Sequence, residues 1–248
     1  PPAVVNGVVI IGGTGNKFKD ASSVNGAVRG FDAVTGEFLW SFDTLIRDPE
    51  SSESLPYTVG GANVWTTMSV DSQRDLVFIP TASASPNFYG GLRPGDNRYA
   101  NSVLALRAQT GELAWHYQTI HHDIWDWDLP SHPLLVDITT ENGKRPIVIA
   151  LGKTGMVYTF HRDNGEPYFD IEEREVPTDG ILGDQLSPTQ PFPVKPPPLV
   201  RQGISPDDAW GVTPYEREAC REMIASARHG GMFTPMSTKG SIMYPQVG

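Results

Sequence analysis

The stretch Thr119–Pro133, TIHHDIWDWDLPSHP, carries the densest set of ionisable side chains in the 248-residue chain. It holds three Asp, three His and two Trp. A carboxylate in such a cluster could act as a general base or as a metal ligand. The adjacent His121 and His122 are a weaker metal pair, because neighbours on an extended chain point to opposite faces. An Asp beside a Trp in a loop is commonly a turn former or a strand cap, so Asp126 has a structural interpretation as well as a catalytic one.

Composition narrows the class of protein before any motif is used. The chain has 25 Gly and 22 Pro, which indicates many short elements and favours an all-β fold. A formal net charge of −10 argues against nucleic acid as a partner, because duplexes are bound mainly through Lys and Arg that neutralise phosphates. Cys220 is the only cysteine, so neither an intrachain disulfide nor a zinc knuckle can form.

A pattern of four strands and their turns recurs three times along residues 1–182. The first turn, Asn6-Gly7, tolerates positive φ at both positions and predicts a hairpin. The first strand of the second copy is expected at 64–70, and the fourth strand of the third copy at 166–171. In each copy an aromatic residue follows the last turn glycine by four positions, at Gly36 and Trp40, Gly111 and Trp115, and Gly165 and Phe169. Such repeats predict three four-stranded blades of a β-propeller, with these aromatic residues packed between blades.

Three blades cannot close a ring, since propellers have about 4–8 blades. The chain is therefore expected to pair with the remaining blades of a propeller or with another copy of itself. It opens directly on a strand pattern and shows neither a basic n-region nor a long apolar run. We expect it to be an excerpt of a longer protein.

Residues 183–248 are expected to form a Pro-rich excursion with one helix between two blades, followed by the start of the next blade. Prolines in the first part of this segment exclude a central strand and favour extended surface chain. A helix is predicted from about Pro214 to His229, with Thr213 as N-cap, Glu216 completing a capping box and Gly230 just past the end. Its buried stripe is expected at Ala219, Met223, Ile224 and Ala227. Residues 241–245, SIMYP, are expected to start the next blade.

The repeat also predicts where side chains from different blades meet. In a propeller, residues that enter the innermost strand of each blade converge on the central axis. Residues 63–66 and 122–128 are such entry points, and residues 152–154 end a second strand. An axial pocket could therefore gather Trp65, Asp126 and Lys153. Each also has a plainer interpretation, with Trp65 in the core and Lys153 in a polar hairpin turn.

Several long segments resemble quinoprotein dehydrogenases, which use pyrroloquinoline quinone (PQQ). These segments are HHDIWDWDLPSHP, DAVTGEFLW, AQTGELAW, NVWT, SPNFYGGLRPGDNRYANS and GKTGMVYTF. The similarity covers nearly the whole chain and is greatest to the glucose, quinate and polyol branch. It implies about three to four blades of an eight-bladed propeller with one inserted helix, and a periplasmic location.

The resemblance also implies roles for individual residues. By position in these motifs, Asp126 matches the catalytic aspartate, Lys153 the lysine that contacts the quinone and Trp65 the tryptophan under the cofactor ring. Asp126 is preferred to Asp123 and Asp128 because it alone lines up with the family position, 27 residues before Lys153 (153 minus 126). The residue types suit the chemistry, because a carboxylate can take a hydroxyl proton, a cation can stabilise charge on quinone oxygens and an indole supplies a flat face.

Calcium is a further expectation from the resemblance, with Asp126 and Ser83 as metal ligands and Asn16 as an additional cofactor contact. Many relatives have a metal-binding Asn after a Gly where this chain has Ala82-Ser83, and the acidic ligand expected near Gly15-Asn16 is missing. A serine is a poorer ligand for a divalent ion than Asn or Asp. The sequence therefore supports calcium less strongly than PQQ.

These observations favour a PQQ-dependent dehydrogenase that oxidises an alcohol, sugar or polyol by hydride transfer to the quinone. Electrons would then pass to an external quinone or a cytochrome. The alternative is a non-catalytic β-propeller that serves as an interaction scaffold. The changes at Gly15 and Ser83 favour this alternative, whereas Asp126, Lys153 and Trp65 oppose it. A metal-dependent hydrolase built on the His and Asp cluster is a third possibility and ranks below both.

Overall fold

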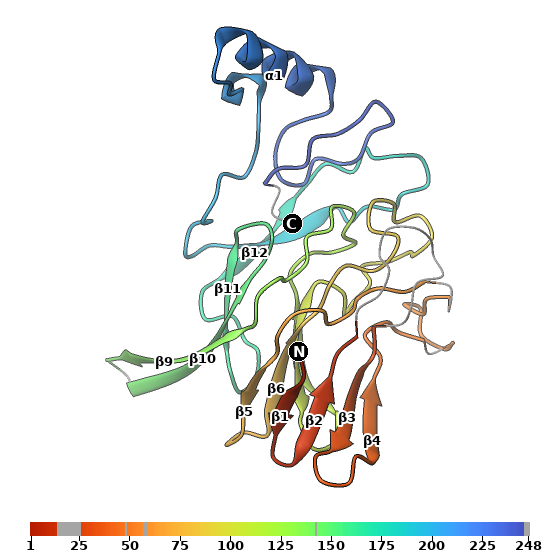
Figure 1. Cartoon of the computed structure of the whole chain (residues 1–248), viewed down its shortest axis with the longest axis vertical. Helices are drawn as coiled ribbons and strands as arrows, with labels where there is room; N and C mark the ends of the chain where they lie inside the picture. The colour runs from red at the N-terminus through yellow and green to blue at the C-terminus, as the bar shows by residue number, and fades with distance from the viewer. Residues whose placement is uncertain (14–25, 48, 57–58, 142, 246–248) are drawn as a thin grey trace.

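The computed structural model describes residues 1–13, 26–47, 49–56, 59–141 and 143–245. The described residues form four antiparallel sheets, of which three follow one another along the chain as blades and lie side by side, and their one α-helix stands apart from the blades (Figure 1). The predicted class, all-β propeller blades with one inserted helix, is confirmed. Asn16 lies outside the described residues.

Blade 1 is a four-stranded sheet whose strands are hydrogen-bonded in sequence order. The strands are β1 (Ala3–Val5), β2 (Val8–Ile11), β3 (Val28–Asp32) and β4 (Phe38–Phe42). The predicted hairpin is present, with φ of 46° at Asn6 and 81° at Gly7. Two left-handed residues give a turn whose twist matches that of the flanking strands.

Blade 2 has the same order of four strands. The strands are β5 (Ser69–Asp71), β6 (Leu76–Pro80), β7 (Ser102–Arg107) and β8 (Leu113–Gln118). The prediction of a strand from residue 64 was wrong in its start. Thr66 donates a 2.8 Å hydrogen bond from Oγ1 to the carbonyl of Pro130, so the chain before Ser69 contacts the β8–β9 loop instead of joining the sheet.

Both faces of blade 2 are buried. Along β6, Val77 and Ile79 belong to the core shared with blade 1, whereas Leu76 and Phe78 belong to the core shared with blade 3. Successive side chains of a strand point to opposite faces, so β6 contributes side chains to both cores. This explains why β6 reads as a continuous apolar run and is buried at every position.

Blade 3 differs from the prediction in its outer strand. It has three strands, β9 (Leu134–Thr140), β10 (Gly143–Leu151) and β11 (Val157–His161). The expected fourth strand at 166–171 is reduced to one bridge between Phe160 and Pro167, because proline has no N–H to continue the ladder. The chain beyond it forms a separate pair, β12 (Ile171–Glu175) with β13 (Thr189–Pro193).

The repeated aromatic residues lie between neighbouring blades, as predicted for Trp40 and Trp115. A Cβ atom on Gly111 of blade 2 would lie 2.5 Å from Trp40 of blade 1, and one on Gly165 of blade 3 would lie 2.5 Å from Trp115. Each indole N–H donates to the carbonyl three residues before that glycine, at 3.0 Å and 3.1 Å. Phe169, the third member of the set, is 37% exposed.

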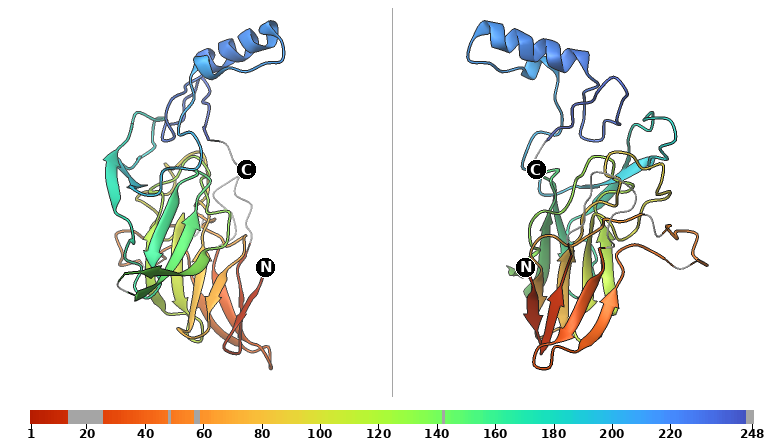
Figure 2. Two further views of the ribbon diagram at one scale, coloured as in Figure 1. Left: turned by 90° about the vertical axis from the view of Figure 1, so that its left-hand side faces the viewer. Right: turned by 45° about the vertical axis from the view of Figure 1, so that its right-hand side comes forward.

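The segment after β13 carries the short 3₁₀ helix η1 (Pro206–Asp208) and the helix α1 (Pro214–Ser226), which projects away from the blades (Figure 2). The capping box of Thr213 and Glu216 is confirmed, although the helix ends before His229. Of the predicted buried stripe only Ile224 is buried, since Ala219 and Met223 are exposed and Ala227 is a half-buried residue just past the end of the helix.

Two further observations concern the whole described chain. The described residues of 241–245 form one isolated bridge and no strand, so the expected start of a next blade is not seen there. Among the described residues, α1 is the only α-helix, and it lacks the length and apolar character needed to cross a membrane.

Candidate active site

The loop between β8 and β9 carries three aspartates with different partners. Asp123 is buried and organises the loop itself. Its carboxylate accepts hydrogen bonds from the backbone N–H groups of Trp125 and Trp127, both at 2.8 Å, and from the amide of Asn101 at 2.8 Å. The hydroxyl of Ser83 also donates to it. These contacts give Asp123 a structural role in holding the loop.

Asp128 is fully buried and links Ser83, Trp65 and Lys153. Its Oδ1 accepts hydrogen bonds from the backbone N–H of Ser83 at 2.8 Å and from the Ser83 hydroxyl at 3.1 Å. Its Oδ2 lies 3.1 Å from the indole nitrogen of Trp65 and 3.4 Å from Nζ of Lys153. Asp128 thus fixes the two residues predicted to contact a cofactor.

Asp126 lies between these buried aspartates in sequence but is more accessible to a ligand. Its side chain is 18% exposed, compared with 1% for Asp128. Its φ of 62° is a left-handed conformation, which Asp tolerates better than most residues. Oδ2 lies 3.0 Å from Nζ of Lys153, and Oδ1 accepts a hydrogen bond from the amide of Asn87.

Lys153 stands two residues after the end of β10, between the carboxylates of Asp126 and Asp128. Burial acts to lower the pKa of Lys153, but the charge of Asp128 and the hydrogen bond and charge of Asp126 outweigh it, so the pKa is raised above its ordinary value. The ammonium group is therefore protonated at neutral pH. It also lies 6.0 Å from the ring centroid of Trp65, which is 36% exposed. Together they present a flat aromatic face beside a fixed cation.

Arg93 joins the loop between β6 and β7 to the loop that bears the aspartates. Its Nε and Nη2 donate to the carbonyl of Pro86 at 3.1 Å and 3.0 Å, and Nη2 also donates to the carbonyl of Asp123. Burial lowers the pKa of Arg93 to about 10, against the opposing charges of Asp123 and Asp184. The guanidinium thus stays charged at neutral pH while it is completely buried.

The structure brings together the predicted catalytic Asp126 and the predicted cofactor residues Lys153 and Trp65. Sequence reasoning considered Asp128 only as an alternative to Asp126 and did not foresee its contacts with Trp65 and Lys153, and it missed Asn87 and Arg93. The only sequence signal for these last two was their position in the SPNFYGGLRPGDNRYANS segment.

The described residues alone do not fit a calcium ion. The hydroxyl of Ser83 is engaged by Asp123 and Asp128, and the ammonium of Lys153 faces one oxygen of Asp126. Among the described residues, no group of three or more His, Cys, Asp and Glu side chains could hold a metal. Asp126 and Ser83 as metal ligands remain a prediction that would need donors beyond the described part of the chain.

The two adjacent histidines serve separate contacts. The ring of His121 lies 2.9 Å from the amide oxygen of Gln118 and 3.1 Å from a carboxylate oxygen of Glu173. The ring of His122 lies 2.7 Å from the carbonyl of Gly95. In the described residues they form no shared metal site, so the metal-dependent hydrolase is not supported.

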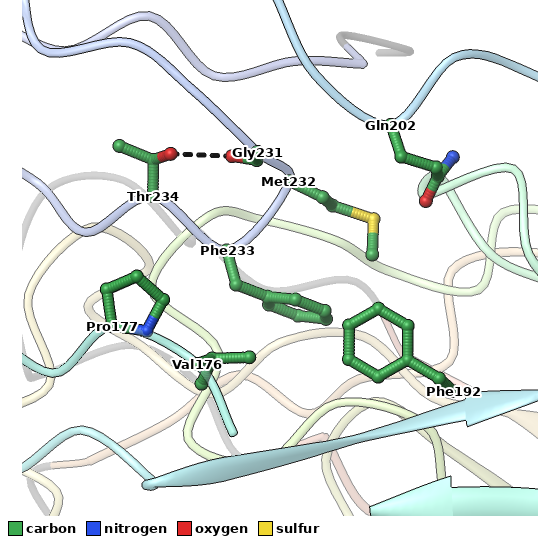
Figure 3. A pocket seen from close by; sticks show the side chains of 8 residues that line it. All are labelled: Val176, Pro177, Phe192, Gln202, Gly231, Met232, Phe233 and Thr234. Carbon is green, nitrogen blue, oxygen red and sulfur yellow. Dashed lines mark hydrogen bonds between the residues drawn. The ribbon is translucent and has the colours of Figure 1, made fainter. Parts of the chain in front are cut away.

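A separate cavity of about 240 Å³ lies where the β12–β13 pair meets the chain after α1 (Figure 3). It is lined by Val176, Pro177, Phe192, Gln202, Gly231, Met232, Phe233 and Thr234. None of these side chains is ionisable, so the cavity offers no acid or base. Phe233 packs edge-on against the stacked rings of Trp125 and Trp127, and in this way it supports the loop that carries Asp126.

Comparisons with known proteins identify the family of the chain. The family described as PQQ: glucose/ethanol/alcohol dehydrogenase, beta-propeller domain, matches residues 1–248. The quinoprotein glucose dehydrogenase of Escherichia coli (strain K12) is 39% identical and the quinate/shikimate dehydrogenase (quinone) of Acinetobacter baylyi is 35% identical, over 99% and 98% of this chain. In both cases the chain spans 31% of the relative.

A solved structure gives the same result at the level of the fold. The quinohemoprotein alcohol dehydrogenase of Comamonas testosteroni superposes with a TM-score of 0.59 at 26% identity, over 78% of this chain and 31% of that one. The propeller blades, the cluster of Asp126, Lys153 and Trp65, and the whole-chain match lead to one conclusion. The chain belongs to the family of PQQ-dependent glucose, ethanol and alcohol dehydrogenases, as part of their β-propeller domain.

Proposed function

We propose that the chain forms the catalytic part of a PQQ-dependent dehydrogenase that oxidises a hydroxyl group of a sugar or polyol. The observation that carries the proposal is the placement of Lys153 between Asp126 and Asp128, beside the exposed ring of Trp65. The names of the relatives, which specify glucose and quinate or shikimate, support this class of substrate.

Asp126 would take the proton of the substrate hydroxyl. Asp126 and Asp128 both face Lys153, and the side chain of Asp126 is the more exposed, at 18% compared with 1% for Asp128. The neighbouring ammonium favours the ionised form of Asp126, since an opposite charge within about 4–6 Å stabilises a carboxylate. A general base must be ionised and within hydrogen-bond reach of the proton that it removes.

Trp65 and Lys153 would hold the cofactor. PQQ, when bound, supplies the hydride acceptor. The exposed indole offers a planar surface for a planar quinone, and the ammonium suits the anionic oxygens of that cofactor. The hydrogen bond from the Trp65 indole to Asp128 sets the orientation of this surface before any ligand arrives. Asn16 and a calcium ion, with Asp126 and Ser83 as ligands, remain predictions for the same site.

The partners follow from the same proposal. The chain would work with the remaining blades of a propeller or with another copy of itself, and would deliver electrons to a quinone or a cytochrome in the periplasm. The words quinone and quinohemoprotein in the names of two relatives support such acceptors. The net charge of −10 remains an argument against nucleic acid.

The test is Asp126→Asn in a full-length protein that contains this chain, loaded with PQQ. We expect PQQ binding to persist and turnover to fall by about 10²–10⁴-fold, the usual contribution of a general base. Asp123→Asn is the matched control, because Asp123 faces backbone donors rather than Lys153. A wild-type protein that binds no PQQ would instead support the non-catalytic scaffold.

A further inference from the structure

Asp126 is held by a second side chain besides Lys153. The amide of Asn87 donates a hydrogen bond to Oδ1 of Asp126, while Nζ of Lys153 lies 3.0 Å from Oδ2. The two donors come from different loops, the β6–β7 loop and the end of β10. With a separate donor on each oxygen, the plane of the carboxylate is fixed in both position and rotation.

Asn87 is buried at a cost to stability. It is 1% exposed, and its Oδ1 has no hydrogen-bond partner among the described residues. A buried acceptor without a partner destabilises a fold, because it has given up its hydrogen bonds to water. Turning the amide over would bring Oδ1 against the carboxylate of Asp126, so the observed orientation serves the contact with Asp126. A buried polar atom without a protein partner calls for an explanation, and the contact of the amide with Asp126 supplies one.

Arg93 fixes Asn87 relative to Asp126. The guanidinium binds the carbonyl of Pro86, directly before Asn87, and the carbonyl of Asp123, three residues before Asp126. Because Arg93 is completely buried, both loops are attached to one immobile group. The contact between Asn87 and Asp126 is therefore built into the packing of the two loops.

We infer that Asn87 is a positioning residue, whose amide holds the Asp126 carboxylate in the orientation needed to accept a proton from a substrate hydroxyl. The inference rests on the proposed function, since it assigns Asn87 a role through Asp126. It differs from a purely structural role in one respect. Removing a purely structural side chain lowers the stability of the fold. Removing the Asn87 amide should instead lower kcat.

The experiment compares Asn87→Leu with wild type in the full-length, PQQ-loaded protein. Leucine keeps the approximate shape of Asn but removes the donor and the unpaired oxygen. We expect kcat to fall by about 10- to 100-fold, the factor that corresponds to one hydrogen bond to a charged group, with KM changed less than about twofold. PQQ affinity, followed by tryptophan fluorescence, should stay the same, and the melting temperature should change little, because the lost hydrogen bond to Asp126 and the removed unpaired oxygen have opposite effects on stability.

Asn101→Ala is the matched control, since Asn101 is an equally buried amide in the same loop but binds Asp123. It should lower the melting temperature and leave kcat per folded molecule unchanged. The inference is overturned if Asn87→Leu keeps full kcat, or if its activity falls only in proportion to the folded fraction. If the leucine variant does not fold, Asn87→Ser replaces it, because serine is smaller and its side chain is too short to contact Asp126. The same fall in kcat is expected.

The outcomes for the two proposals separate. If wild type fails to bind PQQ, or if Asp126→Asn keeps its turnover, then the proposed function fails whatever Asn87 does. If Asp126→Asn is inactive, binds PQQ and is folded while Asn87→Leu is fully active, only the role of Asn87 is refuted.

Discussion

Gly111→Ala should weaken the junction between blades 1 and 2. The new Cβ atom would lie 2.5 Å from Trp40, so the indole must move by about 1 Å to restore an ordinary carbon contact of ~3.5 Å. Such overpacking costs about 1–3 kcal/mol, and a strained indole hydrogen bond adds about 1 kcal/mol. Alanine must also adopt the φ of 73° found at Gly111, which costs a further 1–2 kcal/mol or so.

Gly7→Ala isolates the backbone part of this effect. Gly7 has a φ of 81°, and a Cβ atom there would meet nothing within 4 Å. It should lower the free energy of unfolding by only about 1–2 kcal/mol. Gly111→Ala should therefore be worse by roughly 2–4 kcal/mol, the packing and hydrogen-bond share of its effect.

The assay is urea unfolding of the full-length protein, followed by tryptophan fluorescence, with Trp40→Phe as a further variant. Phenylalanine removes the indole donor and narrows the ring, so Gly111→Ala should be milder in that background. Equal destabilisation by Gly111→Ala and Gly7→Ala would refute the idea that the indole closes this junction.

Three other outcomes follow from the structure. Asp123→Asn should lower the melting temperature, because at least one charge-assisted hydrogen bond of about 1.5–3 kcal/mol is lost. Its turnover per folded molecule should stay unchanged. A folded but inactive Asp123→Asn would show that Asp126 is not the base. Trp65→Ala should weaken PQQ binding, because stacking on the indole acts in the ground state. Lys153→Ala should mainly slow the reduction of PQQ, because negative charge on the ring grows during reduction. Equilibrium titration measures the binding and rapid-mixing spectra measure the reduction, and both would be unchanged in these variants if the pocket lies on other loops. Burial acts to raise the pKa of Asp71, but its hydrogen bonds, first that from Arg162 of blade 3, outweigh burial and hold the pKa below the ordinary 3.8. The ionised carboxylate therefore stabilises the fold above pH 3.8, and this contribution is lost as the pH falls through the lower folded pKa. The stability gap between wild type and Asp71→Asn should close on acid titration, and a gap that stays constant below pH 3.8 would contradict this.

Features that depend on a few neighbouring residues could be predicted from the sequence. The Asn6-Gly7 turn and the capping box of Thr213 and Glu216 are set by local backbone geometry, and both are present. The meeting of Asp126 with Lys153 depends on tertiary structure. It was predictable only because the repeats place equivalent positions at one end of the blades and because the segments resemble a family.

What could not be predicted depends on distant partners. The chain at 166–171 has a strand-like composition, but Pro167 interrupts the ladder and β12 finds its partner in β13 instead. The exposure of Met223 on α1 depends on what covers the helix, which no periodicity reveals. Asn87 and Arg93 contact Asp126 and Asp123 across a long loop, and single polar residues in loops give no recurrent signal.

The Trp40 and Trp115 junctions have a consequence for how the protein can change. Trp40 packs on the hairpin turn between β7 and β8, at Gly111, and Trp115 packs on the turn that follows β11, at Gly165. In an antiparallel sheet the β6–β7 and β8–β9 loops emerge at the opposite end, and these loops carry Asn87 and Asp126. The contacts that hold the blades together and the proposed chemistry therefore lie on opposite rims. On this proposal, insertions and substitutions can accumulate on the rim that carries Asp126, and substrate preference can diverge, while the contacts between blades stay unchanged.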